Sequence, residues 1–288
     1  MPIHHFKLGN LNLTSLQDNA QTIDIRQELG QVPEGELLAA MQSHGYKDFN
    51  TQIGFNILFV QTPDHKVLID CGTGMNDLLD SMSEAKLKAD EIDYLIITHS
   101  DFDHIGGIDH FPNAKIFFPK PAYDLWTNDM IRKGMIENFK TVFLKFLDAD
   151  FVARGAAYRE DYGANKLPGL NKRIQLIKEE EEFLPGFKMV FTPGHRPDHF
   201  AVEIESEGET LVHIADGYRH AIQVDHPDWY SHFDSYPEQM AESLVMINDR
   251  IKSKGALVFG SHFTFPGLAR FDGDRLVMGD GWDTDLTD

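Results

Sequence analysis

Short apolar runs alternate with turn-forming residues along most of the chain. Residues 55–61 form one such run, and residues 66–69 form the next, which ends at Asp70-Cys71-Gly72. Runs of this length that are rich in Val, Ile, Leu and Phe and stop at Gly, Pro or Asp are typical of buried β-strands. The pattern therefore predicts strands at residues 55–61, 66–69, 94–98, 115–118, 174–177, 187–191, 201–204, 211–214 and 257–259.

Between these runs, apolar residues recur at the spacing of an α-helix. Leu78 and Met82 lie one turn apart within residues 75–89, and residues 237–252 show the same amphipathic pattern. Residues 122–151 carry a longer apolar stripe of Trp, Met and Phe side chains. Because apolar residues at this period form one face of a helix, all three stretches are predicted to be helical.

The predicted strands and helices are interleaved from end to end. No linker-like or low-complexity segment divides the chain, and no repeat of solenoid period is present. Interleaved elements favour an α/β fold. We expect a single domain over residues 1–288, with a helical insertion at about 122–170.

Composition and charge narrow the class of protein. The 288 residues are 42% hydrophobic and 25% charged, as expected of a globular protein. With 46 acidic and 26 basic residues the formal net charge is −20, which disfavours nucleic acid as a partner because the phosphate backbone would be repelled. No apolar stretch approaches the roughly 20 residues of a membrane span, and residues 1–10 lack the pattern of a signal peptide. The sequence thus predicts a cytoplasmic protein without membrane contact.

One segment of six residues concentrates potential metal ligands. His99, Asp101, Asp103 and His104 directly follow the apolar run at 94–98 and precede two glycines. Imidazole and carboxylate groups bind Zn²⁺ and harder divalent ions. Carboxylates this close together repel one another unless a cation lies between them. The segment therefore predicts a metal site.

Three further candidate ligands also follow predicted strands. His195, Asp216 and His262 each lie shortly after an apolar run, as His99 does. Loops at the ends of strands are where rigid scaffolds present functional groups. Seven ligands would suit two metal ions with Asp216 shared between them, and a metal pair about 3.5–4 Å apart activates water for hydrolysis. The expected substrate is a small molecule.

The catalytic candidates are Asp103, Asp216 and one residue that follows Asp216. Tyr218, Arg219 and His220 follow after Gly217, and any one of them is a candidate for polarising a carbonyl or protonating a leaving group. Of the three, Tyr218 is the residue predicted to be catalytic. The sequence leaves open which of them assists.

Taken together, these motifs resemble those of the metallo-β-lactamase fold superfamily. They are Thr98-His99-Ser100-Asp101-Phe102-Asp103-His104-Ile105-Gly106-Gly107, Thr192-Pro193-Gly194-His195, Asp216 and His262, preceded by Leu68-Ile69-Asp70-Cys71-Gly72. The resemblance implies a four-layer αββα sandwich of two mixed β-sheets flanked by helices. It also implies a first site of His99, Asp101 and His195, a second site of Asp103, His104 and His262, and Asp216 shared. Asp70 would orient a ligand histidine.

Asp101 departs from the family pattern. Most members of the family that the chain resembles have the motif HxHxDH, whereas this chain has HxDxDH. A carboxylate is a harder ligand than imidazole and adds negative charge, so Mn²⁺ or Fe²⁺ stand beside Zn²⁺ as candidates for the two divalent ions. The substitution leaves the occupancy of the first site open.

The C-terminal motif indicates a branch of the superfamily. Residues 261–267, Ser-His-Phe-Thr-Phe-Pro-Gly, resemble a stretch of the quorum-quenching lactonase-like and methyl parathion hydrolase-like members. This resemblance implies hydrolysis of a lactone or another ester, with Phe263 and Phe265 lining an apolar pocket. Phosphotriester hydrolysis on the same centre is the first alternative.

Two alternatives of other classes stay open. The carboxylate in the first site resembles the first site of the diiron members of the superfamily. A degenerate metal site would instead suit a non-catalytic binding protein. The sequence alone decides neither the physiological substrate nor the metal, and it leaves a homodimer open.

Overall fold

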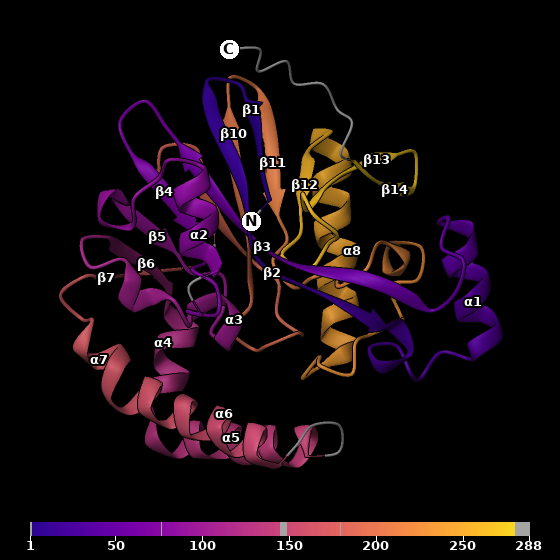
Figure 1. Ribbon diagram of the computed structural model, residues 1–288, viewed down its shortest axis with the longest axis horizontal. Coiled ribbons are helices and arrows are strands. Elements are labelled where there is room, and N and C mark those ends of the chain that lie inside the picture. The colour runs from indigo at the N-terminus through magenta and orange to yellow at the C-terminus, as the bar shows by residue number, and fades with distance from the viewer. Residues whose placement is uncertain (1, 76, 145–148, 179, 280–288) are drawn as a thin grey trace.

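Two seven-stranded mixed sheets face each other, and helices cover their outer surfaces (Figure 1). The structure, a computed structural model, describes residues 2–75, 77–144, 149–178 and 180–279. This arrangement confirms the predicted α/β fold, a four-layer αββα sandwich of two mixed sheets. Within the described residues, no helix is both long enough and apolar enough to cross a membrane.

The first sheet contains the N-terminal half of the chain. Its strand order follows the sequence, from β1 to β7; β1 to β4 pair antiparallel, and β4 to β7 pair parallel. Its strands are β1 (Ile3–Leu8), β2 (Leu11–Asp24), β3 (Asn50–Gln61), β4 (Lys66–Ile69), β5 (Tyr94–Ile96), β6 (Lys115–Pro119) and β7 (Ile174–Ile177).

The second sheet contains the C-terminal half. Its order runs from β14 back to β8, with β11 and β12 parallel and the other neighbours antiparallel. Its strands are β8 (Glu182–Leu184), β9 (Phe187–Phe191), β10 (Phe200–Ser206), β11 (Glu209–His213), β12 (Leu257–Phe259), β13 (Leu268–Asp272) and β14 (Arg275–Met278).

The helices lie at the outer faces and in one long insertion. They are α1 (Glu34–Ser43), α2 (Asp77–Glu84), α3 (Phe102–Ile105), α4 (Lys120–Thr127), α5 (Asp129–Phe143), α6 (Ala149–Asp161), α7 (Leu167–Gly169) and α8 (Pro237–Lys254). Short single-turn segments are Ile25–Gln27, Ala89–Glu91, Ile108–His110 and Ala221–Val224, and Tyr162–Lys166 is a π-helical turn.

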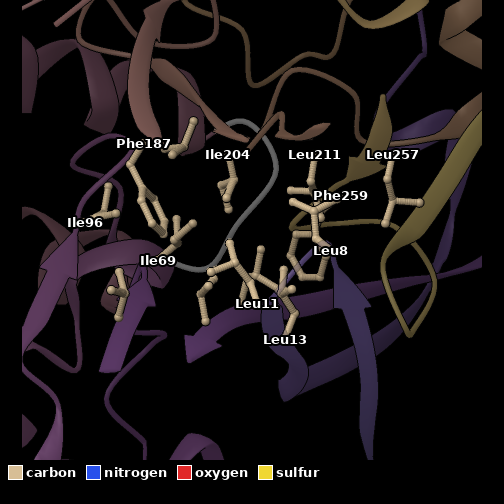
Figure 2. Packing of buried hydrophobic residues seen from close by; sticks show 14 of the residues in the cluster. Leu8, Leu11, Leu13, Ile69, Ile96, Phe187, Ile204, Leu211, Leu257 and Phe259 are labelled. Atoms are coloured by element: carbon tan, nitrogen blue, oxygen red, sulfur yellow. The ribbon is translucent and has the colours of Figure 1, made fainter. Parts of the chain in front are cut away.

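Side-chain alternation along the strands builds the layers. On β4, Val67 and Ile69 point between the two sheets, whereas Leu68 points outward to the cluster that contains Leu78 of α2. Figure 2 shows Ile69 and Ile96 of the first sheet facing Phe187 and Ile204 of the second. Each fully buried side chain of this size contributes roughly 1.5–3 kcal/mol. The apolar contact between the sheets therefore fixes their relative position.

A third apolar cluster covers the outer face of the second sheet. Val212 and Val258 pack there against Leu244 and Ile247 of α8. The helix ends at Gly255, whose φ of 59° is in the left-handed region that glycine adopts without strain. This contact holds β11 and β12, the strands that lead to two candidate ligands.

Helices α4 to α7 connect β6 to the parallel strand β7. They correspond to the segment predicted as a helical insertion at about 122–170, and residues 145–148 of it lie outside the described residues. The buried Arg132 of α5 pairs with Glu160 of α6 at 3.0 Å, which holds the two helices together. The division of the chain into domains stays a prediction.

The N-terminal strand pair is absent from the sequence prediction. β2 buries Ser15, Gln17 and Asp18, so its pattern lacks the apolar run of an ordinary strand. Asp18 is satisfied because it accepts hydrogen bonds from the backbone N–H groups of Thr73 (2.8 Å) and Leu78 (3.0 Å). The polar residues of β2 thus hold the turn after β4, which adjoins the candidate site.

Candidate metal centre

The candidate ligands lie at one edge of the sandwich, where strands of both sheets end. His99 follows β5, and His195, Asp216 and His262 follow β9, β11 and β12. A backbone hydrogen bond from Phe200 N–H to Thr98 O (3.1 Å) joins the two sheets at this edge. Side chains far apart in the sequence are therefore brought together.

Six of the seven predicted ligands form two close groups. One ligand atom of each of His99, His195 and Asp216 lies within 4.8 Å of the others, and the same holds for Asp103, His104 and His262. Asp216 lies between the groups: its Oδ1 is 3.0 Å from His104 Nε2. Its Oδ2 is 3.0 Å from His262 Nε2 and 3.4 Å from His195 Nε2. This is the position of a shared ligand.

The four histidines present the same nitrogen to the centre because their Nδ1 atoms are engaged elsewhere. His104 Nδ1–H donates to Asp70 Oδ2 (2.7 Å) and His195 Nδ1–H donates to Asp234 Oδ1 (2.9 Å). His262 Nδ1–H donates to the backbone oxygen of Gly54 (3.0 Å). A histidine that donates through Nδ1 keeps a lone pair on Nε2, which is the arrangement of a metal ligand.

His99 reaches the same tautomer through a relay. Thr98 Oγ1–H donates to Asp70 Oδ2 (2.8 Å), so its oxygen accepts from His99 Nδ1–H (3.1 Å). Asp70 also accepts from Thr98 N–H (2.8 Å). It has a φ of 61°, unusual for a residue with a side chain. Asp70 therefore orients two of the candidate ligands.

The unpartnered atoms of the site test whether metal ions fit it. Nε2 of His99, His104 and His195 and Oδ1 of Asp216 are buried and form no hydrogen bond within the described residues. Buried polar atoms in proteins are ordinarily hydrogen-bonded. Four such atoms converging from imidazoles and a carboxylate are the donor set that divalent metals take. The residues present thus fit a pair of cations.

The charges of the site depend on one another. Burial lowers the pKa of His99 well below its usual value, and the nearby His104 adds to this effect. Burial opposes a charge on His104 too, but Asp216 and Asp70 outweigh it and hold its pKa well above the usual range. The carboxylates thus draw positive charge to the centre.

Asp101 is placed differently from the other predicted ligands. Arg196 clamps its carboxylate: Nε donates to Oδ1 at 2.9 Å and Nη2 lies 2.7 Å from Oδ2. Asp101 Oδ2 is also 3.4 Å from His195 Nε2 and 3.9 Å from His99 Nε2. Burial would raise the pKa of Asp101, yet the charge of Arg196, together with His195 and His99, outweighs burial and keeps the pKa well below its usual range. Asp101 borders the first site while its charge is paired with a guanidinium.

The structure does not support the predicted catalytic role of Tyr218. Its hydroxyl accepts a hydrogen bond from the side chain of Asn248 on α8, and its ring lies in the apolar cluster beneath the second sheet. Of the three residues after Asp216, it is Arg219 that reaches the centre, donating from Nη1 to Asp216 Oδ2 (3.1 Å). His220 instead lies beside Thr51 Oγ1 (3.2 Å).

Several residues that position the site were missed or misplaced from sequence. Asp234 and Arg196 lie in polar loops without periodicity, so nothing along the chain marks Asp234 as the partner of His195 or Arg196 as that of Asp101. Phe263 was expected to line a substrate pocket, but it is buried in the same apolar cluster as Tyr218. Strand periodicity does not show in which direction a loop side chain turns.

Comparisons with known proteins agree with this geometry. The family model described as "Metallo-beta-lactamase superfamily" matches residues 54–262. An N-acyl homoserine lactonase of Bacillus thuringiensis is 27% identical over 176 residues, which are 60% of this chain and 56% of that protein. The "Probable metallo-hydrolase Rv2300c" of Mycobacterium tuberculosis is 24% identical over 193 residues, 59% of this chain and 58% of that protein. The chain thus spans somewhat over half the length of these curated relatives.

Solved structures share the fold. AidC, a dizinc quorum-quenching lactonase in complex with a product, superposes with a TM-score of 0.80 at 24% identity, covering 95% of each chain. The hydrolase AbOPH of the beta lactamase superfamily superposes with a TM-score of 0.79 at 20% identity, also covering 95% of each chain. Since the family model covers well over half of the sequence and the structure has the matching fold, this chain belongs to the metallo-β-lactamase superfamily.

Proposed function

We propose that the chain is a dinuclear metal-dependent hydrolase that opens lactones or cleaves related esters. The observation that carries the proposal is the convergence of four Nε2 lone pairs on Asp216, with each Nδ1–H engaged elsewhere. The curated relatives named N-acyl homoserine lactonases support the lactone as substrate class. The two-ion composition is supported by AidC, a dizinc lactonase with the same fold.

We assign the ligands to two sites that share Asp216. His99 and His195 hold the first ion, with Asp101 at its border, and Asp103, His104 and His262 hold the second. Two bound divalent ions would supply Lewis acidity that activates a water molecule and polarises the scissile carbonyl. Zn²⁺ fits these ligands, and the carboxylates also suit Mn²⁺ or Fe²⁺.

Asp103 is assigned the proton transfer. Its side chain is 22% exposed, whereas those of His104 and Asp216 are 2% exposed, so Asp103 is the ligand of its group that solvent and substrate reach. Its Oδ2 lies 3.3 Å from His262 Nε2. A carboxylate in this position can take a proton from the attacking water and return it to the leaving alkoxide.

Arg219 is assigned the stabilisation of the shared carboxylate. Its guanidinium spans Asp216 Oδ2 (3.1 Å) and Glu28 Oε2 (3.0 Å), so Asp216 is held in one orientation between the two groups. The ligand that both ions need is thereby fixed before either arrives, which reduces the reorganisation required during the reaction.

The proposal is tested with protein reconstituted with Zn²⁺ or Mn²⁺. We expect about two ions per chain by elemental analysis and hydrolysis of γ-lactones and aryl esters. Assayed at a metal concentration high enough to fill both sites, Asp103→Asn should lose about 100-fold or more in kcat, in the range of general acid–base catalysis. Asp109→Asn is the matched control, because Asp109 is an exposed acid of the same segment and pairs with Lys166 at 2.6 Å. Fully metallated protein that hydrolyses neither class would overturn the proposal; turnover of phosphotriesters alone would replace it.

A further inference from the structure

A cavity of about 520 Å³ opens beside the candidate metal centre. It lies between the helical insertion and the loops after His195 and before α8. Asp101 lines it, so the cavity reaches the border of the first site. Its size is within the usual range of small-molecule sites. Prominent in its lining are Asp101, Trp126, Met135, Phe139, Arg159 and Arg196.

The two arginines of this cavity use their donors unequally. Besides clamping Asp101, Arg196 donates to the backbone oxygens of His195 (2.8 Å) and Phe233 (2.6 Å). Arg159 donates to the backbone oxygen of Gly155 on its own helix at 3.3 Å. Its guanidinium otherwise stacks on Phe139, 3.8 Å from the ring centroid. A guanidinium has five N–H donors, so within the described residues most of those of Arg159 are left for a ligand.

The charge of Arg159 is also poorly balanced. Within the described residues, the carboxylate in ion-pair range of it is that of Asp101, at 3.9 Å, and Arg196 already neutralises that group. The neighbouring Glu160 turns to Arg132 instead, at 3.0 Å. Arg159 is 14% exposed, and burial of the guanidinium lowers its pKa. A cation removed from water without its own counterion costs free energy, which a bound anion would offset.

We infer that the cavity binds a carboxylate of the substrate at Arg159, so that the preferred substrates are lactones or esters with both a free carboxylate and an apolar segment. The inference rests on the proposed function for the reaction and adds the substrate class. The planar fork of Arg159 matches a carboxylate bidentately. Met135, Phe139 and Trp126 supply the apolar wall. In a chain of net charge −20, the poorly balanced positive charge of Arg159 is what admits an anion to this cavity.

Kinetics with a matched pair of esters tests the inference. The probes are the 4-nitrophenyl monoester of adipic acid, which keeps a carboxylate, and its neutral methyl ester. We expect the KM of the anionic ester to be lower by about tenfold or more, the range of a charge-assisted hydrogen bond. Arg159→Gln should remove this preference by raising the KM of the anionic ester toward that of the neutral ester. Arg159→Lys should restore part of it, because lysine keeps the charge without the fork.

The control variant is Arg154→Gln. Arg154 lies on the same helix α6 but is exposed, so its loss should leave the preference intact. Equal KM values for the two esters in the unaltered protein would overturn the inference while the proposed function stands. The same is true if Arg154→Gln abolishes the preference as fully as Arg159→Gln does.

A binding measurement separates this inference from the reaction itself. Hexanoate, which has a carboxylate and an apolar tail, should raise the Tm of chelator-treated protein, and Arg159→Gln should remove the shift. If hexanoate binds metal-loaded protein only, and binds the variant equally well, the carboxylate lies on the metal ions and the inference fails. If neither ester is hydrolysed, the proposed function fails and the hexanoate shift still decides the inference.

Discussion

The two halves of the candidate centre use similar residues but complete their ligand sets differently. In the second site, Asp103 lies 3.3 Å from His262 and shares one close group with His104. In the first site, Asp101 has its carboxylate paired with Arg196 at 2.7 Å, and the close group is formed with Asp216 instead. Asp101 therefore shares its charge with a guanidinium that would compete with a metal ion, whereas Asp103 does not.

The difference also concerns the net charge of each half. Asp101 and Arg196 together carry no net charge, which is also the charge of a neutral imidazole. Within the described residues, Asp103 has no such arginine at hydrogen-bond distance. The second site thus has a carboxylate whose charge remains for a cation. We expect it to bind metal more tightly, and the following variants break or sharpen this contrast.

Removing the shared ligand should have the largest effect. Asp216→Asn takes a negative charge from between the two groups, so both ions should be lost and kcat/KM should fall by about 1,000-fold, or about 4 kcal/mol. Elemental analysis and lactone hydrolysis measure the two effects. Retention of two ions per chain in this variant would show that Asp216 is not shared.

Progressive chelation should empty the halves in order. Because Arg196 holds the carboxylate of Asp101, the first site should lose its ion at a chelator concentration about tenfold lower or more, an affinity difference of about 1.4 kcal/mol. The expected intermediate holds one ion per chain. Simultaneous loss of both ions would show that the two halves are equivalent.

Two matched variants outside the ligand set should act on different halves. Asp70→Asn weakens the hold on His104, and Asp234→Asn weakens that on His195. Loss of such a partner typically costs about 10–100-fold in metal affinity. Titration of metal into the apo-variants should show weaker binding of the second ion in Asp70→Asn and weaker binding of the first ion in Asp234→Asn. Since Asp70 also supports His99 through Thr98, a smaller effect on the first ion should accompany its loss.

A further prediction concerns a histidine away from both halves, which should affect stability and leave the metal sites unaltered. Burial and the nearby His44 lower the pKa of His220 to about 3. In the unfolded chain His220 has its usual pKa of 6.5 and takes up a proton below that pH, whereas in the folded chain it stays neutral down to about pH 3. Because the unfolded state then binds more protons, the free energy of unfolding falls as the pH falls from about 6.5 to 3. In chelator-treated protein, His220→Asn should flatten this decline by up to about 1.4 kcal/mol per pH unit between pH 6 and 4. Urea unfolding at both pH values gives the slopes, and identical slopes would contradict the prediction.

The sequence was sufficient for the layers, and it pointed to seven candidate ligands, six of which the structure brings together in two close groups. Strand β4 was predicted with its observed bounds, Lys66–Ile69, because its apolar run ends sharply at Asp70. The ligand motifs follow strand ends, which meet at one edge of a sandwich. The strand pair β1 and β2 was missed because β2 buries polar residues that its turn partners satisfy.

What the sequence could not provide is the direction of side chains in loops. Tyr218 and Arg219 are adjacent in the chain, yet the backbone of that turn sends Tyr218 to α8 and Arg219 to Asp216. Likewise Arg196 lies 95 positions from Asp101 along the chain, so their ion pair leaves no local pattern. Such contacts depend on tertiary structure and appear only when the fold is known.

The hydrogen bond between His262 Nδ1 and Gly54 O spans 208 positions, and Asn56 N–H bonds to Ser261 O (2.8 Å) at the same junction. A ligand from the far end of the chain is thus aligned by a strand near its beginning. During synthesis, strand β3 has long left the ribosome before its partner exists. Under the proposed function, the second site is therefore completed only after His262 has been synthesised, and chains truncated before that residue should lack this site.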